Sequence, residues 1–112
     1  MVLLTMLVSF FANATGQQID NLTITKIRSV GNFHVGSIYD DSIELWFSTS
    51  LVWAESMNCT VGYRVYIDAS KTHMVSAAFL AYASGKTVNV YADDTLPLRS
   101  GSCEISYIDI NK

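Results

Sequence analysis

Short segments in which apolar and polar residues alternate constrain the fold of this chain more than any other feature. A period of two is typical of a β-strand that places one face on a core and the other toward solvent. The segments span residues 21–30, 33–39, 43–48, 59–67, 87–91 and 103–110. Together with the length of 112 residues, they predict a single domain that is mainly β.

The first of these segments changes phase part-way along. Leu22 and Ile24 share one face, whereas Ile27 falls on the other phase of the alternation. An extra residue in one strand of a pair, a β-bulge, produces such a change and bends the strand. We therefore expect a bent strand at 21–30.

One helix is predicted at about 70–84, between strands. Asp68 and Ser70 supply oxygens of the kind that cap a helix N-terminus, and Gly85 is suited to a left-handed C-terminal residue. The apolar residues at helical spacing are Met74, Val75, Ala77, Ala78, Phe79, Ala81 and Tyr82. A single helix with a small curled sheet predicts an OB-like Greek-key barrel. The alternative is an α+β fold with the helix on one face of an antiparallel sheet.

Residues 1–14 form an uncharged run in which 11 residues are hydrophobic. The run is shorter than the roughly 20 residues of a membrane-spanning helix. It fits a secretory signal, with Ala12-Asn13-Ala14 as the small-x-small cleavage pattern. No Lys or Arg precedes it, which a truncated start would explain. We expect a domain at 15–112 in a secreted or periplasmic protein with no membrane span after cleavage. The alternative is that 1–14 is a buried strand or helix of the domain.

The chain has two cysteines, Cys59 and Cys103, without the spacing of a zinc site. In an oxidising compartment two cysteines usually pair, and chain entropy would make this disulfide worth about 4 kcal/mol. The alternative is a pair of buried free thiols in a cytosolic protein.

The predicted helix ends and the next strand begins in the stretch YASGKTVNVY at 82–91. A strand carrying Cys59 precedes this helix, and a strand carrying Cys103 and ending in ISYIDI follows it. In this order the chain resembles small exported bacterial domains with OB-like folds, among them the B-subunits of subtilase-cytotoxin and pertussis-like AB5 toxins. The resemblance covers roughly residues 20–110. It implies a glycan-binding homo-oligomer, a pentameric ring, and it identifies no sugar-contacting residue.

Several classes of function are disfavoured by the sequence. With 7 basic and 10 acidic residues, the chain lacks the positive surface of a nucleic-acid binder. His34 and His73 are the only histidines, and no nucleophile-elbow motif accompanies them. The acidic pairs at 40–41 and 93–94 are interpreted as turn residues. We therefore predict a protein that is not an enzyme, with no catalytic residue, metal site or cofactor.

Aromatic and charged residues on two neighbouring strands form the candidate site. Trp46 and Glu44 lie opposite the apolar face of 43–48, and Arg64 and Tyr66 lie opposite Val65. Sugars stack on aromatic rings and hydrogen-bond to acidic and basic side chains, so these four residues are expected to bind a glycan. The same residue types suit a protein interface, and the second expectation is a small structural or inhibitory protein. A third interpretation is that they complete the core.

Overall fold

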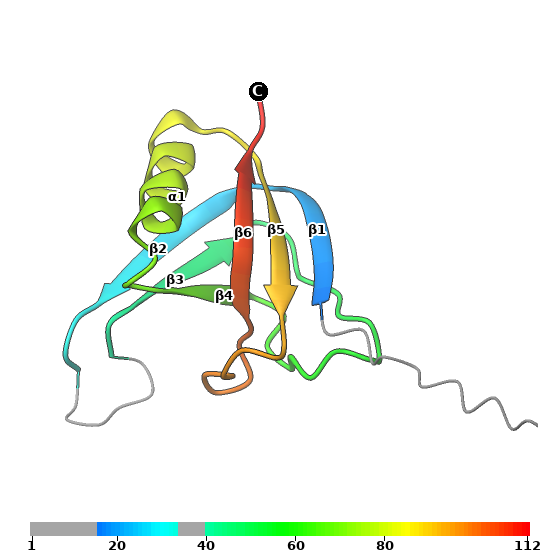
Figure 1. Cartoon of the computed structure of the whole chain (residues 1–112). Helices are drawn as coiled ribbons and strands as arrows, with labels where there is room; N and C mark the ends of the chain where they lie inside the picture. Colours follow the sequence, from blue (N-terminus) through cyan, green and yellow to red (C-terminus); the bar gives the residue numbers. More distant parts are fainter. Residues whose placement is uncertain (1–15, 34–39) are drawn as a thin grey trace, which may run out of the picture.

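The computed structural model describes residues 16–33 and 40–112 (Figure 1). The described part is mainly β with one helix, as predicted. Its elements are β1 Gly16–Leu22, β2 Ile24–Val30, β3 Ser42–Phe47, β4 Arg64–Asp68, α1 Thr72–Ser84, β5 Val88–Asp93 and β6 Glu104–Ile110. The proposed signal at 1–14 lies outside the described residues, as does all of the expected strand 33–39 except Phe33.

The strands form one six-stranded sheet in the order β1-β5-β6-β4-β3-β2. Neighbours are antiparallel except for β4 and β6, which are parallel. The strands at the two ends of this order, β1 and β2, are separated along the chain by Thr23 alone. One segment therefore pairs with β5 through its first half and with β3 through its second half. The sheet curls into a barrel-like shape in consequence (Figure 1).

The predicted β-bulge is confirmed in β2. Ile24 pairs with Phe47 and Lys26 pairs with the adjacent Trp46, so the register shifts between them. After the bulge, Ile27 is half-buried while Lys26 and Arg28 are exposed. The bulge thus turns Ile27 toward the core and the two cations outward. The sequence missed residues 16–20 of β1, where Gly16, Gln17 and Gln18 hide the alternation.

The core is made by the inward faces of the strands and one face of α1. Its buried residues include Leu22, Ile24, Ile43, Leu45, Phe47, Val65, Ile67, Val88, Val90 and Ile105. From α1, Met74, Ala78 and Ala81 pack onto this core, and the helix contacts β2 and β6. Two alanines let the helix approach closely. Within the described residues, no helix is both long enough and apolar enough to cross a membrane.

The two ends of α1 differ in how well the sequence predicted them. The expected side-chain cap at the N-terminus is wrong. Lys71 occupies that position without a capping side chain, and Asp68 Oδ1 instead accepts hydrogen bonds from Ser70 N and Oγ at 2.9 and 2.6 Å. The carboxylate is held by a turn before the helix. The C-terminal prediction is confirmed, because Gly85 has a left-handed φ of 68° and Lys86 N donates to Ala81 O at 3.1 Å.

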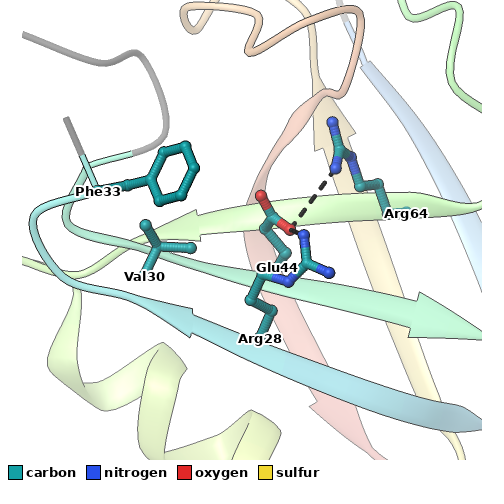
Figure 2. Close-up of a pocket in the computed structure, with 5 residues that line it drawn as sticks. All are labelled: Arg28, Val30, Phe33, Glu44 and Arg64. Atoms are coloured by element: carbon teal, nitrogen blue, oxygen red, sulfur yellow. Dashed lines mark ion pairs between the residues drawn. The ribbon is translucent and has the colours of Figure 1, made fainter.

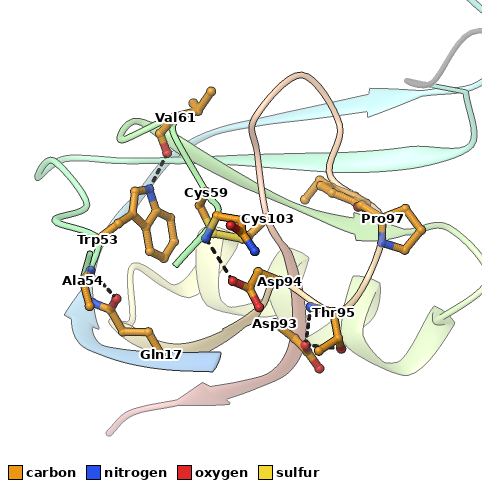
Figure 3. Close-up of a disulfide and its surroundings, with 12 residues drawn as sticks. Gln17, Trp53, Ala54, Cys59, Val61, Asp93, Asp94, Thr95, Pro97 and Cys103 are labelled. Atoms are coloured by element: carbon orange, nitrogen blue, oxygen red, sulfur yellow. Dashed lines mark hydrogen bonds between the residues drawn. A yellow bond between two sulfur atoms is a disulfide. The ribbon is translucent and has the colours of Figure 1, made fainter. Parts of the chain in front are cut away.

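The predicted disulfide is present between Cys59 and Cys103, with their Cα atoms 5.4 Å apart (Figure 3). The predicted strand 59–67 is too long, since β4 begins at Arg64 and Cys59 lies in the preceding loop. The disulfide ties that loop to the residue just before β6. Trp53 supports the same loop by donating from Nε1 to Val61 O at 2.8 Å. Both cysteines are buried.

The acidic pairs lie at turns, as interpreted from the sequence, and Asp94 also joins its turn to the loop at Asn58. Asp40 Oδ1 accepts from Phe33 N at 2.8 Å, and Asp41 has a left-handed φ of 53°. Asp93 Oδ1 accepts from Thr95 N, and Asp94 Oδ2 accepts from Asn58 N, both at 2.9 Å. No cluster of three His, Cys, Asp or Glu suited to a metal ion occurs at 16–33 or 40–112. His34 lies outside the described residues.

Candidate functional site

The register of β3 and β4 brings the four predicted site residues together. Trp46 pairs with Arg64, and Glu44 pairs with Tyr66. Their neighbours Leu45 and Val65 point into the core and are fully buried, which leaves the four on the outer face of the sheet. The face was predicted correctly from the alternation of apolar residues.

Strand β2 adds two cations that the sequence prediction missed. Lys26 pairs with Trp46, and Arg28 pairs with Glu44. A signal for them was available, because the change of phase in 21–30 marked a bulge. Once the bulge is allowed for, Lys26 and Arg28 flank Ile27 and must share the outer face with Trp46.

A pocket of about 310 Å³ lies beside this face (Figure 2). Glu44 extends between two guanidinium groups, and its Oε2 lies 3.6 Å from Nη1 of Arg28 and 3.6 Å from Nη1 of Arg64. Val30 and Phe33 supply an apolar side to the pocket. The pocket therefore combines two cations, one anion and an apolar wall.

The carboxylate of Glu44 is the least satisfied polar group of the site. Its side chain is 5% exposed, and Oε2 has no hydrogen-bond partner within the part of the chain that the structure describes. Glu44 lies on the predicted face of β3 but is buried there. The two arginines compensate its charge at 3.6 Å, but a buried acceptor without a hydrogen bond still costs about 1–3 kcal/mol. A donor group from a ligand would remove this cost.

The two arginines are held differently. Arg64 is 11% exposed at its side chain, and its Nε donates to Ser102 Oγ at 2.8 Å, which fixes it against the start of β6. Arg28 is half-exposed. Arg64 is therefore a largely buried, fixed cation of the pocket, and Arg28 is its solvent-exposed cation.

Trp46 is partly buried and is surrounded by cations. Lys26 Nζ lies 4.5 Å from a ring centroid of Trp46, Arg28 Cζ lies 5.0 Å away and Arg64 Cζ lies 5.7 Å away. Such distances are those of cation–π contacts. Tyr63 stacks with Trp46 at 6.4 Å between centroids. The result is an aromatic and basic surface next to the pocket.

Alternation with Val65 would turn Tyr63 toward the core, but the structure does not place it there. It comes one residue before β4 begins, where the alternation of the strand does not apply. Its side chain is 53% exposed. An exposed ring at this place extends the aromatic surface beyond Trp46.

Tyr66 lies on the outer face but is only 1% exposed, so at this residue the interpretation as part of the core holds. Its hydroxyl donates to Pro97 O, and the guanidinium carbon of Arg99 lies 4.6 Å from its ring. Burial raises the pKa of Tyr66 from 10.0 to about 12; the Glu104 carboxylate adds to the effect and Arg99 opposes it. Tyr66 therefore fastens the loop between β5 and β6 and leaves no ring face for a ligand.

No protein-family model matches this chain, and no curated protein matches it.

Proposed function

We propose that this chain is a non-enzymatic binding module, secreted or periplasmic, that recognises a glycan at the pocket formed by β2, β3 and β4. The buried Glu44 Oε2, which lacks a hydrogen bond among the described residues, is the observation that carries the proposal. A sugar hydroxyl would donate to this oxygen. Arg28 and Arg64 would donate to other sugar oxygens, and the rings of Trp46 and Tyr63 would contact C–H groups.

The strand order supports the choice of this face. Residues 16–30 act as one bent strand, so β3 and β4 are the second and third strands along the chain. In OB folds, strands two and three with the neighbouring loops bind oligonucleotides and oligosaccharides. We propose an OB-like barrel on this basis. Of the two ligands, nucleic acid is disfavoured because the formal net charge is −3.

The test is binding to a glycan array by the wild type and two glutamate variants. Glu44→Gln keeps the shape of the side chain and removes its charge. Glu55→Gln makes the same chemical change at an exposed loop residue and serves as the control. We expect Glu44→Gln to lose glycan binding and Glu55→Gln to keep it. A wild type that binds no glycan on the array, or a Glu44→Gln variant that binds like the wild type, would refute the proposal.

A second candidate function is action through a protein interface, favoured by the outer face of α1. From Thr72 to Ser84 the helix contains no Asp, Glu, Lys or Arg. Phe79, Leu80 and Tyr82 are 43%, 60% and 47% exposed. Exposed apolar patches mark interaction sites, and a second copy of this chain is one partner to test. Light scattering of the wild type and of Leu80→Lys would show an oligomer that the variant dissociates, whereas a wild-type monomer would argue against self-association.

A further inference from the structure

Two tyrosines form a second aromatic surface on the other half of the sheet. Tyr91 on β5 pairs with Tyr107 on β6, and their rings stack at 5.1 Å between centroids with 23° between planes. Val90 and Ala92, which flank Tyr91 on β5, are fully buried. The tyrosine rings therefore lie on the outer face.

Strand β1 shapes this surface. A Cβ atom added to Gly16 would lie 2.1 Å from Tyr91 Oη, so the Tyr91 ring occupies the space that any other residue at this position would fill. Tyr107 donates from its hydroxyl to Gln18 Oε1 at 2.5 Å, and Gln18 Nε2 donates to Asp20 Oδ1 at 2.7 Å. Both rings are thus held across three strands, β1, β5 and β6. Tyr107 remains 36% exposed.

The surroundings of this surface are acidic, in contrast to the pocket at Glu44. Asp109 follows Tyr107 by two residues on β6 and therefore shares its face, and Asp20 is linked to Tyr107 through Gln18. Partial desolvation raises the pKa of Tyr107, and Asp109, Tyr91 and Asp20 raise it further. Neither carboxylate is in an ion pair within the described residues. An anionic ligand would be repelled here, whereas hydroxyl groups would find strong acceptors.

We propose that Tyr107, Tyr91, Gln18, Asp20 and Asp109 form a second binding site, which takes an uncharged glycan. The fixed and exposed ring of Tyr107 offers a flat face to sugar C–H groups. The carboxylates of Asp20 and Asp109 accept hydrogen bonds from sugar hydroxyls, and such bonds are shorter and stronger than those to neutral acceptors. The site is independent of the proposed pocket, since it shares no residue with it and lies on other strands. The two sites together would let one module hold two glycans.

The test follows backbone amide resonances by NMR while methyl glycosides are added. The probes are the uncharged methyl glycosides of glucose, galactose, mannose and N-acetylglucosamine, together with the methyl glycosides of glucuronic and galacturonic acid. At least one uncharged probe is expected to shift the amides of Gln18, Asp20 and Tyr107. The acidic probe of the same ring shape is expected to shift them less. Shifts near Arg28 and Glu44 alone would support the pocket and contradict the second site.

Two variants make the result specific. Tyr107→Ala removes the exposed ring and is expected to abolish the shifts at Asp20, whereas Tyr82→Ala removes an exposed tyrosine of α1 and is expected to keep them. Asp109→Asn, which leaves the ring stack in place, is expected to weaken the same response even where Tyr107→Ala does not fold. The proposal is overturned if none of the four uncharged probes shifts these amides. It is also overturned if trilysine shifts them and no sugar does, because the surface would then be a site for basic peptides.

Discussion

Arg64 and Glu44 form an ion pair in which a hydrogen bond to Ser102 holds the arginine, whereas Glu44 Oε2 has no hydrogen bond among the described residues. Arg64 Nε is bonded to Ser102 Oγ at 2.8 Å, while its Nη1 lies 3.6 Å from Glu44 Oε2. The Glu44 oxygen depends on this arginine and on the half-exposed Arg28 for its compensation. A change at the buried Glu44 carboxylate is therefore expected to affect both the stability of the fold and binding at the pocket.

The two arginines should differ in their contribution to stability. Arg64→Ala removes a cation that is 11% exposed, leaves Ser102 without its partner and weakens the compensation of Glu44. We expect it to lower the free energy of unfolding by about 3 kcal/mol. Arg28→Ala removes a half-exposed cation and should cost less than about 1 kcal/mol. Urea unfolding of both variants measures the difference, and equal losses would contradict this account.

Loss of the disulfide should loosen the loop before β4. A variant with both Cys59→Ala and Cys103→Ala is expected to lose about 2–5 kcal/mol of unfolding free energy. Trp53 packs against this disulfide cluster, so its fluorescence should report the change. Wild-type protein unfolded in a reducing agent is the control and should match the double variant. Unchanged stability in the variant would mean that packing alone holds the loop.

Stability should fall at alkaline pH through Tyr66. Its folded pKa, about 12, lies above the ordinary value of 10.0. The unfolded chain therefore releases this proton first, so the contribution of Tyr66 is complete below about pH 10 and is lost as pH rises toward 12. Urea unfolding across this range measures the decline. In Tyr66→Phe the decline should be smaller, and an equal decline would assign it to other groups.

Export should change the mass of the chain in two ways. We expect the protein recovered from a secreting host to begin near Thr15, which follows the proposed cleavage pattern at 12–14. Its intact mass should also lack two hydrogens because Cys59 and Cys103 are joined. Reduction should restore these hydrogens and serves as the control. A mass equal to the full chain with two thiols would refute both expectations.

The sequence predicted the faces of the strands better than the exposure of their residues. Alternation placed Glu44, Trp46, Arg64 and Tyr66 on one side, because side-chain direction in a strand depends on parity alone. Burial on the outer face depends on what covers it. The loop between β5 and β6 covers Tyr66 through Pro97, and two arginines cover Glu44. Neither contact leaves a local pattern in the sequence.

Ends of elements were predicted where one residue determines them. Gly85 ends α1 because its backbone adopts a conformation that other residues avoid. The start of α1 was predicted less well. The Asp68 carboxylate could either cap the helix or accept hydrogen bonds in the preceding turn, and it bonds to Ser70 in the turn. The start of β1 was missed because Gln17 and Gln18 are in a strand only through their pairing with β5, which lies far along the chain.

The position of Thr23 has a consequence for the order in which this protein can fold. β1 pairs with β5 through contacts such as Gln17 with Ala92, and β2 pairs with β3 through Lys26 and Trp46. β1 can therefore pair only after β5, which is synthesised late, whereas β2 can pair as soon as β3 has been synthesised. Long-range pairing of this kind slows folding. β2 and β3 can thus form a hairpin early, and the docking of β1 on β5 completes the native state.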